Sequence, residues 1–347
     1  MKLGVVGATG LVGTELISIL IERGFNPGRI VAQARRSTNL QISGSTIRST
    51  PLDVRRLLEC SVVFLAVPAD LAREIAPALR ESGIATVDNS SAFRMDASVP
   101  LVVPEVNGDD LTGSFVANPN CATILLLLAV GPLHRAFTCT DIRVCTYQAV
   151  SGAGRGQLDR LRTETGAALR GEDDDSTRTP AGQSSDSRLR MAFNIWSHES
   201  AIDPTTGMND EETKIMRETS RILGTGISVS ATCIRVPVER VHGEAVTVDF
   251  VRPVQPSAVK DVLEHARGVL LVDGPGPSAR DASGLDDVLV GRIRADVNTR
   301  RADGTSTRYH FWLAGDQLRK GAALNAVQIA ERMGYQSRQR AISAVTT

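Results

Sequence analysis

The 347-residue chain lacks several features that would commit it to a particular class of protein. Its 39 acidic residues balance its 39 basic residues, so no net charge draws it toward nucleic acid or an acidic membrane surface. No apolar run reaches the roughly 20 residues of a membrane-spanning helix, and the N-terminus opens on a strand-like segment without the composition of a signal peptide. We therefore expect a cytoplasmic protein that binds neither nucleic acid nor membranes.

Cysteine and lysine are also scarce. The five cysteines form no CxxC pair and the five histidines have no metal-ligand spacing, so the sequence predicts neither a disulfide framework nor a metal site. Only 4 lysines accompany 35 arginines, which makes each lysine in a polar motif a candidate for a specific role. The length suits two domains, or one large α/β unit with an elaboration.

Strand-like apolar runs alternate with helical periodicity in the first half of the chain, which is the pattern of a parallel sheet covered by helices. After residue 121, longer alternating segments predict a sheet with one covered face. We predict an α/β protein with a Rossmann-type parallel-sheet domain (1–120 plus a C-terminal helical segment 316–347) and an α+β domain with a large mixed sheet (121–315). The expected strands are Lys2–Val6, Arg29–Ala34, Ser61–Val67, Ile84–Asp88, Asp141–Ala149, Ile227–Arg235, Glu244–Val251 and Arg308–Leu313, and the expected helices are Leu11–Arg23, Val54–Leu58, Leu71–Glu81, Glu211–Leu223, Ser257–Val269 and Gly321–Arg332.

Two further segments have the composition of irregular structure. Arg170–Arg188 is rich in acidic residues, Ser, Thr, Gly and Pro, so a solvated loop is expected there. The tail from Ser337 is polar and is expected to fray.

A glycine-rich turn, Gly7-Ala8-Thr9-Gly10-Leu11-Val12-Gly13, joins the first strand to the first helix. Glycines allow a tight turn and let backbone amides approach a pyrophosphate closely. The spacing is GxxGxxG rather than GxGxxG, but its place between a strand and a helix favours dinucleotide binding. The predicted contacts are Gly7, Thr9, Gly10, Leu11, Val12 and Gly13.

The end of the second strand indicates which dinucleotide is bound. An NAD site carries Asp or Glu there to bind the ribose hydroxyls, whereas this chain has Arg35, Arg36 and Ser37. Guanidinium groups suit a 2′-phosphate, which a carboxylate would repel. The sequence therefore predicts NADP rather than NAD.

One cysteine stands where a nucleophile is readily activated. Asn118-Pro119-Asn120-Cys121 follows a short apolar run and precedes the helix-prone segment Ala122–Leu128. At the first turn of a helix, a thiol meets exposed N–H groups and the positive end of the helix dipole, and both favour the thiolate. We expect Cys121 to attack an acyl group; a small buried apolar cysteine is the alternative.

Five further polar side chains lie at positions where a hydrophobic core would not require them. The amide of Gln148 ends one predicted strand before a glycine turn, and Arg235 and His242 flank the connection between two predicted strands. Glu211 and Lys214 share one face of a predicted helix. A buried amide, a solvated arginine and an ordinary helix ion pair are the alternatives, but the coincidence with a reactive cysteine and a nucleotide site favours catalysis. These side chains are Gln148, Arg235, His242, Glu211 and Lys214.

Taken together, these motifs resemble those of the aspartate-β-semialdehyde dehydrogenase family along nearly the whole chain. The resemblance implies NADPH-dependent reductive dephosphorylation of L-aspartyl-4-phosphate to L-aspartate-4-semialdehyde through a Cys121 thioester, a step toward lysine, threonine, methionine and diaminopimelate. It also implies that 1–120 with 316–347 binds NADP and that 121–315 carries catalysis and dimerisation, in a homodimer or homotetramer. The matching segments are Gly7–Gly13, Asp88–Arg94, Val102–Asn107, Asn118–Cys121, Tyr147–Gly154, Phe193-Asn194, Glu211–Lys214, Ser228–Val238, His242 and Leu318–Asn325.

The resemblance also assigns roles to individual residues. Cys121 would be the nucleophile and His242 the acid and base, with Gln148 orienting the acyl group and Asn120 supporting the surroundings of the thiol. The substrate contacts would be Arg94 and Lys214 to phosphate, Arg235 to the α-carboxylate and Glu211 to the amino group. Gly152 and Asn325 would join the cofactor contacts.

The chain departs from the family pattern at several uncharged positions. Ala122 stands where Ser or Thr is usual, Leu125 where glutamine is often found, Gly243 where serine is common and Gln317 where asparagine is usual. None of these changes removes a charged or nucleophilic group. The reaction class therefore stands, while catalytic efficiency and the exact substrate stay open.

Three alternative functions stay open beside this one. N-acetyl-γ-glutamyl-phosphate reductases use the same chemistry, but their cysteine typically follows glycine, whereas Asn120 precedes it here, and their substrate has no free ammonium for Glu211 and Lys214 to serve. A non-catalytic NADP-binding homologue is the second alternative, against which the intact polar set argues. An active copy in a specialised pathway is the third.

Overall fold

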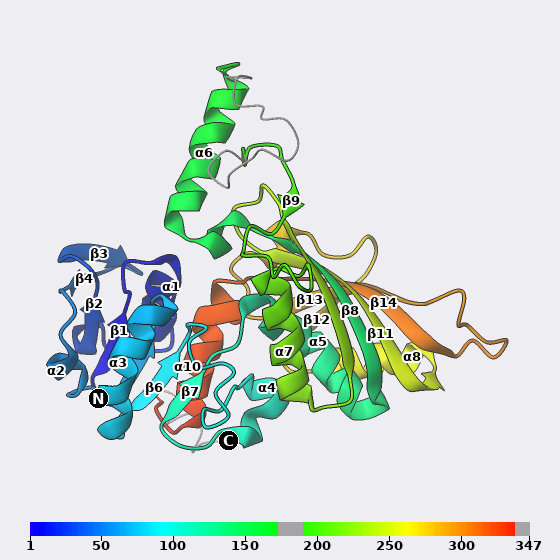
Figure 1. Cartoon of the computed structure of the whole chain (residues 1–347), viewed down its shortest axis with the longest axis horizontal. Coiled ribbons are helices and arrows are strands. Elements are labelled where there is room, and N and C mark those ends of the chain that lie inside the picture. The colour runs from blue at the N-terminus through cyan, green and yellow to red at the C-terminus, as the bar shows by residue number, and fades with distance from the viewer. Residues whose placement is uncertain (173–189, 337–347) are drawn as a thin grey trace.

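The computed structural model of the protein describes residues 1–172 and 190–336. Two sheets with their helices lie side by side, and helix α6 (Arg155–Leu169) projects away from both (Figure 1). The predicted tail from Ser337 lies outside the described residues, as does most of the predicted loop Arg170–Arg188. Within the two described ranges, no helix is both long and apolar enough to cross a membrane.

The N-terminal sheet has five parallel strands in the order β2-β1-β5-β6-β7. Every residue of β1, β5 and β6 is buried, as expected for strands whose two faces are both covered. This arrangement confirms the predicted Rossmann-type sheet. Its elements are β1 (Leu3–Val6), α1 (Leu11–Glu22), β2 (Ile30–Gln33), α2 (Val54–Leu57), β5 (Val62–Leu65), α3 (Ala69–Glu81), β6 (Ala85–Asp88) and β7 (Phe115–Ala117), with the hairpin β3 (Thr38–Ile42) and β4 (Ser45–Ser49).

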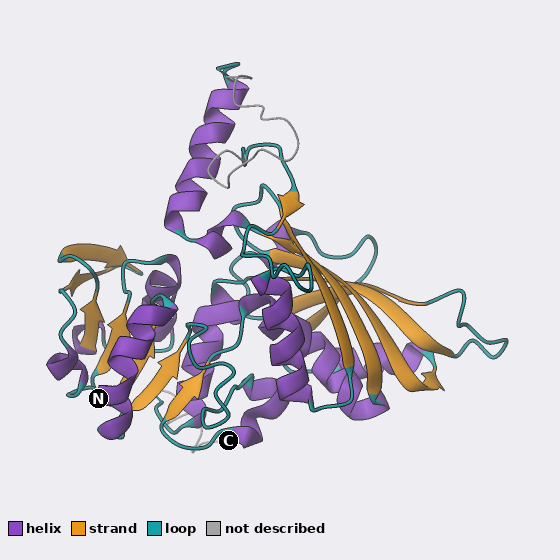
Figure 2. Cartoon of the chain, viewed as in Figure 1, coloured by secondary structure: helices purple, strands orange, loops and turns teal. Residues whose placement is uncertain are grey.

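The second sheet has seven strands in the order β12-β13-β14-β11-β8-β10-β9, and its long members fan across the right of Figure 2. Strands β8 and β10 run parallel, whereas β11 is antiparallel to both β8 and β14. The predicted large mixed sheet is thus confirmed. The sheet and the helices that accompany it are α5 (Cys121–Phe137), β8 (Cys139–Gln148), β9 (Trp196–Ser197), α7 (Asp210–Leu223), β10 (Ser228–Arg235), β11 (His242–Val254), α8 (Pro256–Glu264), β12 (Val269–Val272), α9 (Ala279–Ala282), β13 (Val288–Ala295) and β14 (Ser306–Gly315). Short helical segments elsewhere in the chain are η1 (Pro27–Arg29), α4 (Pro104–Asn107), η2 (Gly108–Asp110) and η3 (Val150–Ala153).

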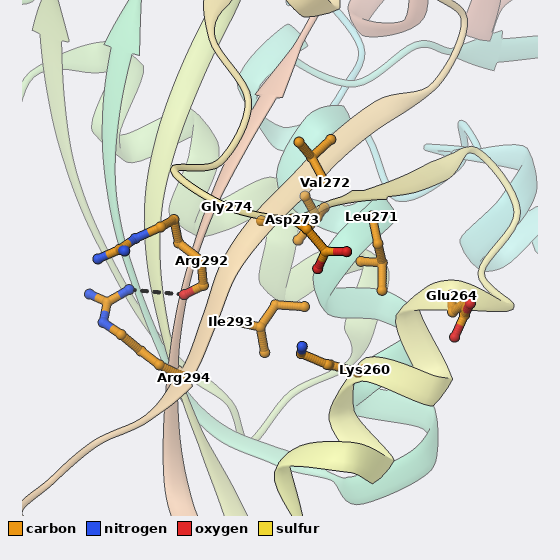
Figure 3. Close-up of a pocket in the computed structure, with 11 residues that line it drawn as sticks. Lys260, Glu264, Leu271, Val272, Asp273, Gly274, Arg292, Ile293 and Arg294 are labelled. Carbon is orange, nitrogen blue, oxygen red and sulfur yellow. Dashed lines mark hydrogen bonds between the residues drawn. The ribbon is translucent and has the colours of Figure 1, made fainter.

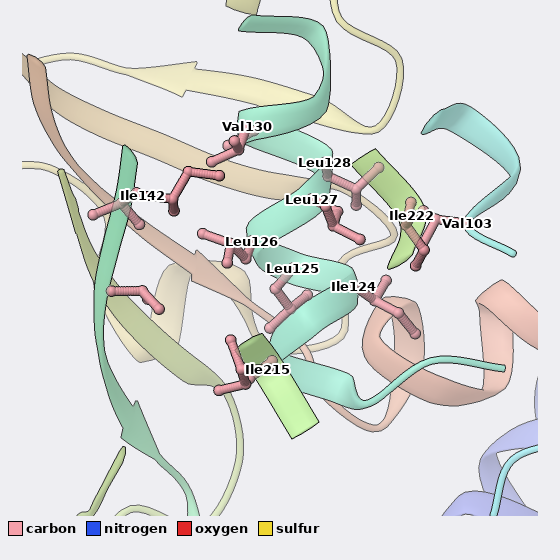
Figure 4. Close-up of a cluster of buried hydrophobic side chains, with 14 of the residues drawn as sticks. Val103, Ile124, Leu125, Leu126, Leu127, Leu128, Val130, Ile142, Ile215 and Ile222 are labelled. Carbon is pink, nitrogen blue, oxygen red and sulfur yellow. The ribbon is translucent and has the colours of Figure 1, made fainter. Parts of the chain in front are cut away.

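Helix α5 forms the centre of the larger core, against one face of the mixed sheet (Figure 4). Its run Ile124–Leu128 is at most 1% exposed, because the sheet covers one side and α7 the other. Ile142 on β8 and Ile215 on α7 pack against this run. A helix that is apolar all round requires such burial. Since α5 begins at Cys121, the core holds that residue firmly in place.

The chain returns to the first sheet at its end. The π-helical turn η6 (Arg319–Leu324) leads into α10 (Asn325–Arg332), whose apolar face joins the core of the first sheet. The predicted final helix is therefore present, although it begins as a π-helical turn. Such turns are frequent at functional sites, and here a Cβ atom on Gly321 would lie only 3.2 Å from Cβ of Cys121.

Some predicted elements differ from those observed. The predicted helix Ser257–Val269 ends at Glu264 with His265 as its C-cap, and Val269 instead begins strand β12; Gly268, at φ +76°, lies in the turn just before that strand. The β3–β4 hairpin, helix α6 and strand β13 were not predicted. The hairpin strands are short and mostly polar, so their sequence carries little strand signal.

Candidate active site

Cys121 is the first residue of helix α5, and Asn120 is its N-cap. The Asn120 side-chain oxygen accepts hydrogen bonds from the backbone N–H groups of Ala122 at 3.0 Å and Thr123 at 3.3 Å. Its amide nitrogen donates to Glu211 Oε1 at 2.8 Å. Asn120 therefore both starts the helix and ties the surroundings of the thiol to α7.

His242, the first residue of β11, faces the thiol. Its Nε2 lies 3.5 Å from Cys121 Sγ, and its Nδ1 accepts the backbone N–H of Ala149 at 3.0 Å. Because Nδ1 is an acceptor, a neutral His242 carries its proton on Nε2. The imidazole thus presents an N–H donor to the sulfur.

Both members of this pair are neutral in the free protein. Burial raises the pKa of Cys121 to about 12, and the Glu211 carboxylate adds to this effect. Burial also lowers the pKa of His242 to about 3, reinforced by the Arg235 cation. Desolvation of the sulfur thus opposes the thiolate that the helix N-terminus favours.

Gln148, at the end of β8, lies beside both residues. Its Oε1 accepts from the Thr146 hydroxyl at 3.0 Å, so its Nε2 is directed toward Glu211 Oε1 at 3.1 Å and lies 3.5 Å from His242 Nε2. The Lys214 ammonium donates to the other Glu211 oxygen at 3.2 Å. Although burial opposes ionisation, Lys214 and the hydrogen-bonding amides lower the pKa of Glu211 to about 2. Glu211 is thus a buried, fully ionised carboxylate.

Arg235, at the end of β10, is 2% exposed. Its Nη1 donates to the carbonyl oxygen of Ala149 at 2.7 Å, and its Nη2 donates to His198 Nε2 at 2.8 Å. Glu199 takes the remaining edge of the guanidinium, with Nη2 to Oε1 at 2.6 Å and Nε to Oε2 at 3.1 Å. Against the effect of burial, Arg235 lowers the pKa of Glu199.

Arg94 comes from the loop after β6 and is also buried. It donates to the carbonyl oxygens of Asn118 at 2.9 Å and Asn89 at 2.8 Å, and to Glu218 Oε1 at 3.2 Å. These bonds engage three of its five N–H groups. Glu218 in turn accepts the backbone N–H of Asn120 at 2.6 Å, so Arg94 is anchored next to the cysteine loop.

Most of these side chains line one cleft of about 570 Å³ between the two sheets, whereas His242 and Glu218 are buried and do not line it. A second groove of about 600 Å³ lies at the carboxyl ends of β1 and β2, and the two hollows share Gly10 and Ala66. A ligand could therefore extend continuously from the glycine turn to the thiol. The predicted residues that line the cleft are Gly10, Leu11, Val12, Arg94, Asn120, Cys121, Gln148, Gly152, Glu211, Lys214 and Arg235, and those that line the groove are Gly7, Thr9, Gly10 and Arg35.

The glycine turn has the shape that a dinucleotide needs. Gly7 adopts φ +85°, and a Cβ atom there would collide with the carbonyl oxygen of Ala66. A Cβ atom on Gly13 would collide with the carbonyl oxygen of Gly7, so only glycine lets α1 approach the strand this closely. The residues present thus fit a bound dinucleotide.

Four predicted cofactor residues do not line these hollows: Gly13, Arg36, Ser37 and Asn325. Arg36 and Ser37 are exposed beside the groove but do not line it. Asn325 is fully buried, donating to the Val102 carbonyl oxygen at 3.0 Å and to Asn118 Oδ1 at 2.7 Å. Its amide therefore fastens α10 to the cysteine loop, and its cofactor contact stays a prediction.

Val241, just before His242, has a strained backbone. Its φ of +82° is rare for a β-branched residue. Gln317 holds it in place, because Gln317 Oε1 accepts the Val241 N–H at 2.7 Å while Nε2 donates to the Ser151 hydroxyl at 2.6 Å. Strain that surrounding bonds maintain in this way is typical of positions next to a functional group.

Two further hollows formed by the described residues carry no such set of groups. The pocket in Figure 3, about 530 Å³, lies between α8 and strands β12 and β13 and contains none of the predicted site residues. Arg294 there donates to the carbonyl oxygen of Arg292 at 3.0 Å (Figure 3). Among residues 1–172 and 190–336, no group of His, Cys, Asp and Glu side chains could hold a metal ion.

The comparisons with known proteins agree with this geometry. The semialdehyde dehydrogenase NAD-binding domain matches residues 2–114, and the semialdehyde dehydrogenase dimerisation domain matches residues 130–320. Aspartate-semialdehyde dehydrogenases from Synechocystis and Bacillus subtilis are 38% and 35% identical over 95% and 96% of this chain, and over 96% and 97% of their own. The chain belongs to the aspartate-semialdehyde dehydrogenase family.

Solved structures of the family superpose closely on this family member. Aspartate-semialdehyde dehydrogenase II from Vibrio cholerae has a TM-score of 0.85 at 35% identity, covering 95% of this chain and 97% of its own. The same enzyme complexed with ASA has a TM-score of 0.85 at 34% identity, covering 96% and 97%. The resemblance drawn from the motifs is thus confirmed, and the chain is an oxidoreductase with a nucleotide-binding domain.

Sequence reasoning missed several residues of this dehydrogenase site. Glu218 lies seven residues after Glu211 on α7, a spacing that puts both on one helix face and could have revealed it. His198 and Glu199 lie in a loop without periodicity, so no sequence signal tied them to Arg235.

Proposed function

We propose that this protein catalyses the NADPH-dependent reductive dephosphorylation of L-aspartyl-4-phosphate to L-aspartate-4-semialdehyde, a step toward lysine, threonine, methionine and diaminopimelate. The observation that carries the proposal is the position of Cys121 Sγ, which lies at a helix start 3.5 Å from a fixed imidazole N–H. The same cleft holds a guanidinium and an ionised carboxylate, the two groups that an α-amino acid requires.

The cleft offers a partner for each charged group of this substrate. Arg235 presents a planar fork that suits the α-carboxylate, and the ionised Glu211 suits the ammonium. Arg94 and Lys214 supply positive charge for the phosphate. Because an ionised carboxylate attracts an ammonium more strongly than an uncharged N-acetyl group, Glu211 favours a substrate with a free amino group.

The first step is attack by Cys121 on the acyl carbon. The C–S bond forms, the C–O bond to phosphate breaks, and the thiol proton leaves with the departing hydrogen phosphate. The backbone N–H of Cys121 and the second N–H of the Gln148 amide stabilise the negative charge that develops on the acyl oxygen.

The second step reduces the thioester. A bound nicotinamide cofactor supplies the hydride. The Nε2–H of His242 donates a hydrogen bond to the sulfur or the oxyanion as the carbon–sulfur bond breaks, and a proton from solvent then restores the thiol. A preorganised hydrogen bond of this kind is worth about 10²–10³-fold in rate.

The preference for NADP follows from the cations beside the groove. Arg35 lines the groove and Arg36 and Ser37 lie next to it, with no carboxylate at the end of β2 to repel a 2′-phosphate. We propose that residues 1–120 with 316–347 bind this cofactor and that 121–315 carry catalysis and self-association. The face of the mixed sheet opposite α5 would join two copies, in a homodimer or as the unit of a homotetramer.

One assay tests the function. Oxidation of L-aspartate-4-semialdehyde with NADP should require inorganic phosphate, because phosphate must attack the thioester in the reverse direction. Oxidation at the same rate without phosphate would indicate a hydrolytic aldehyde dehydrogenase instead. Activity confined to the N-acetyl-γ-glutamyl semialdehyde would indicate the related reductase.

A further inference from the structure

A carboxylate of the protein itself occupies the group that should bind the substrate carboxylate. Glu199 holds the Nε–Nη2 edge of Arg235 through two charge-assisted hydrogen bonds, of 3.1 and 2.6 Å. Both residues line the same cleft as Cys121. A bidentate carboxylate is the ligand that this edge of a guanidinium recognises best.

The rest of the guanidinium cannot offer a second complete fork. Nη1 donates to the carbonyl oxygen of Ala149 at 2.7 Å, and Nη2 already serves both Glu199 and His198. A ligand carboxylate that seeks two parallel bonds from Arg235 must therefore take the place of Glu199.

Glu199 is attached in a way that allows such an exchange. It lies in the loop between β9 and α7, and its side chain is 30% exposed, compared with 3% for Arg235. Its neighbours in the loop are held independently, since the Ser200 hydroxyl accepts the Glu211 N–H at 3.1 Å and Arg235 binds His198. Release of the Glu199 carboxylate would break its two bonds to Arg235 and leave these anchors in place.

We propose that Glu199 is a specificity-determining residue that occupies the α-carboxylate position on Arg235 until a substrate carboxylate displaces it. The proposal rests on the role given above to Arg235. Occupation of the subsite reduces the apparent affinity of a ligand that must bind Arg235, by the fraction of molecules in which Arg235 is free. A ligand that makes no use of Arg235 is unaffected.

The test compares Glu199→Gln with the wild-type protein. The amide keeps the size of the side chain but removes the charge, so the KM for L-aspartate-4-semialdehyde should fall about tenfold with little change in kcat. A direct probe is L-2-aminobutyrate, which has the carboxylate and ammonium but no group that reacts, and its Kd should fall by the same factor. Glu239→Gln is the matched control, because Glu239 makes an equally bidentate pair with Arg162, at 2.8 and 2.8 Å, on the exposed surface.

The possible results separate this proposal from the proposed function. Wild-type protein without phosphate-dependent activity would refute the function. An active wild type with unchanged KM and Kd in Glu199→Gln would refute the role of Glu199 alone. A higher KM in the variant would also refute it, since Glu199 would then be helping to hold the ligand. Thermal melting of each variant shows that it is folded.

Discussion

Serine at Gly243 should destabilise this protein, although serine is common at that position in its family. A Cβ atom at Gly243 would lie 2.5 Å from Cζ2 of the Trp312 indole and closer still to Cη2. The indole is held on both sides, because its Nε1 donates to the Pro277 carbonyl oxygen at 2.8 Å and its ring lies 5.6 Å from that of Tyr147. Tyr147 pairs with Gly243 from the neighbouring strand, so the two rings meet above the glycine.

These contacts set the loss in free energy of unfolding that Gly243→Ser should cause. Overpacking of this kind typically costs about 1–3 kcal/mol. Escape of the indole would lose an aromatic contact worth about 0.5–1.5 kcal/mol and a hydrogen bond worth about 1 kcal/mol. Either route predicts a loss of about 2 kcal/mol for Gly243→Ser. Because His242 is the adjacent residue, kcat should also fall, since a 1 Å misplacement of a catalytic group can cost about 10²-fold.

Urea denaturation and steady-state kinetics measure the two effects. Ala245→Ser is the control, because Ala245 lies on the same strand and face but is exposed. Trp312→Phe removes the edge of the ring that collides, so Gly243→Ser should cost much less in that background, giving a coupling free energy of about 1–2 kcal/mol. Equal costs of Gly243→Ser in the two backgrounds would refute the steric argument.

The remaining predictions concern the nucleophile, the cofactor and pH. Cys121→Ala should abolish turnover while the Kd for NADPH stays within about twofold, whereas Cys145→Ala should keep turnover; normal turnover of Cys121→Ala would overturn the mechanism. Arg35→Glu should reduce the preference for NADPH over NADH by at least about tenfold, and Arg36→Glu should reduce it less, because only Arg35 lines the groove. The pKa of His242 is about 3 in the folded protein and about 6.5 in the unfolded chain. Its contribution to the free energy of unfolding is therefore complete above pH 6.5 and is lost as the pH falls toward 3. In urea denaturation at a series of pH values, His242→Asn should show a weaker dependence of the free energy of unfolding on pH in this range.

The cofactor turn and the nucleophile could be predicted because their signals are local. Glycines between a strand and a helix, or a cysteine after Asn120 at a helix start, depend on residues that are adjacent in sequence. The distance between Cys121 and His242 could not be predicted in this way. It depends on the pairing of β11 with β8 across about a hundred residues, and the motif resemblance supplied that link instead.

The sequence did not reveal which partners the polar side chains of the site have, or how deeply each side chain is buried. The hydrogen bonds of Asn325 to Val102 and Asn118, for example, join residues 223 and 207 positions apart in the sequence. The helix start suggested a thiolate at Cys121, but desolvation depends on the surrounding core, which no local pattern records. The contact between Glu199 and Arg235 was not predicted for the same reason, because the tertiary fold alone brings this loop residue to its partner.

Each cation of the cleft already has a carboxylate partner, in the pairs Arg94–Glu218, Arg235–Glu199 and Lys214–Glu211. A substrate with an anionic group at each end must therefore use free N–H groups or displace a partner. Glu218 and Glu211 are buried and accept further hydrogen bonds around Asn120, so neither can leave without exposing a network. Glu199 alone of the three side chains is substantially exposed. Exchange should thus occur at the α-carboxylate and not at the phosphate. Glu199→Gln should therefore leave the KM for inorganic phosphate unchanged in the reverse reaction, and an equal fall in both KM values would show that Glu199 acts through the general charge of the cleft.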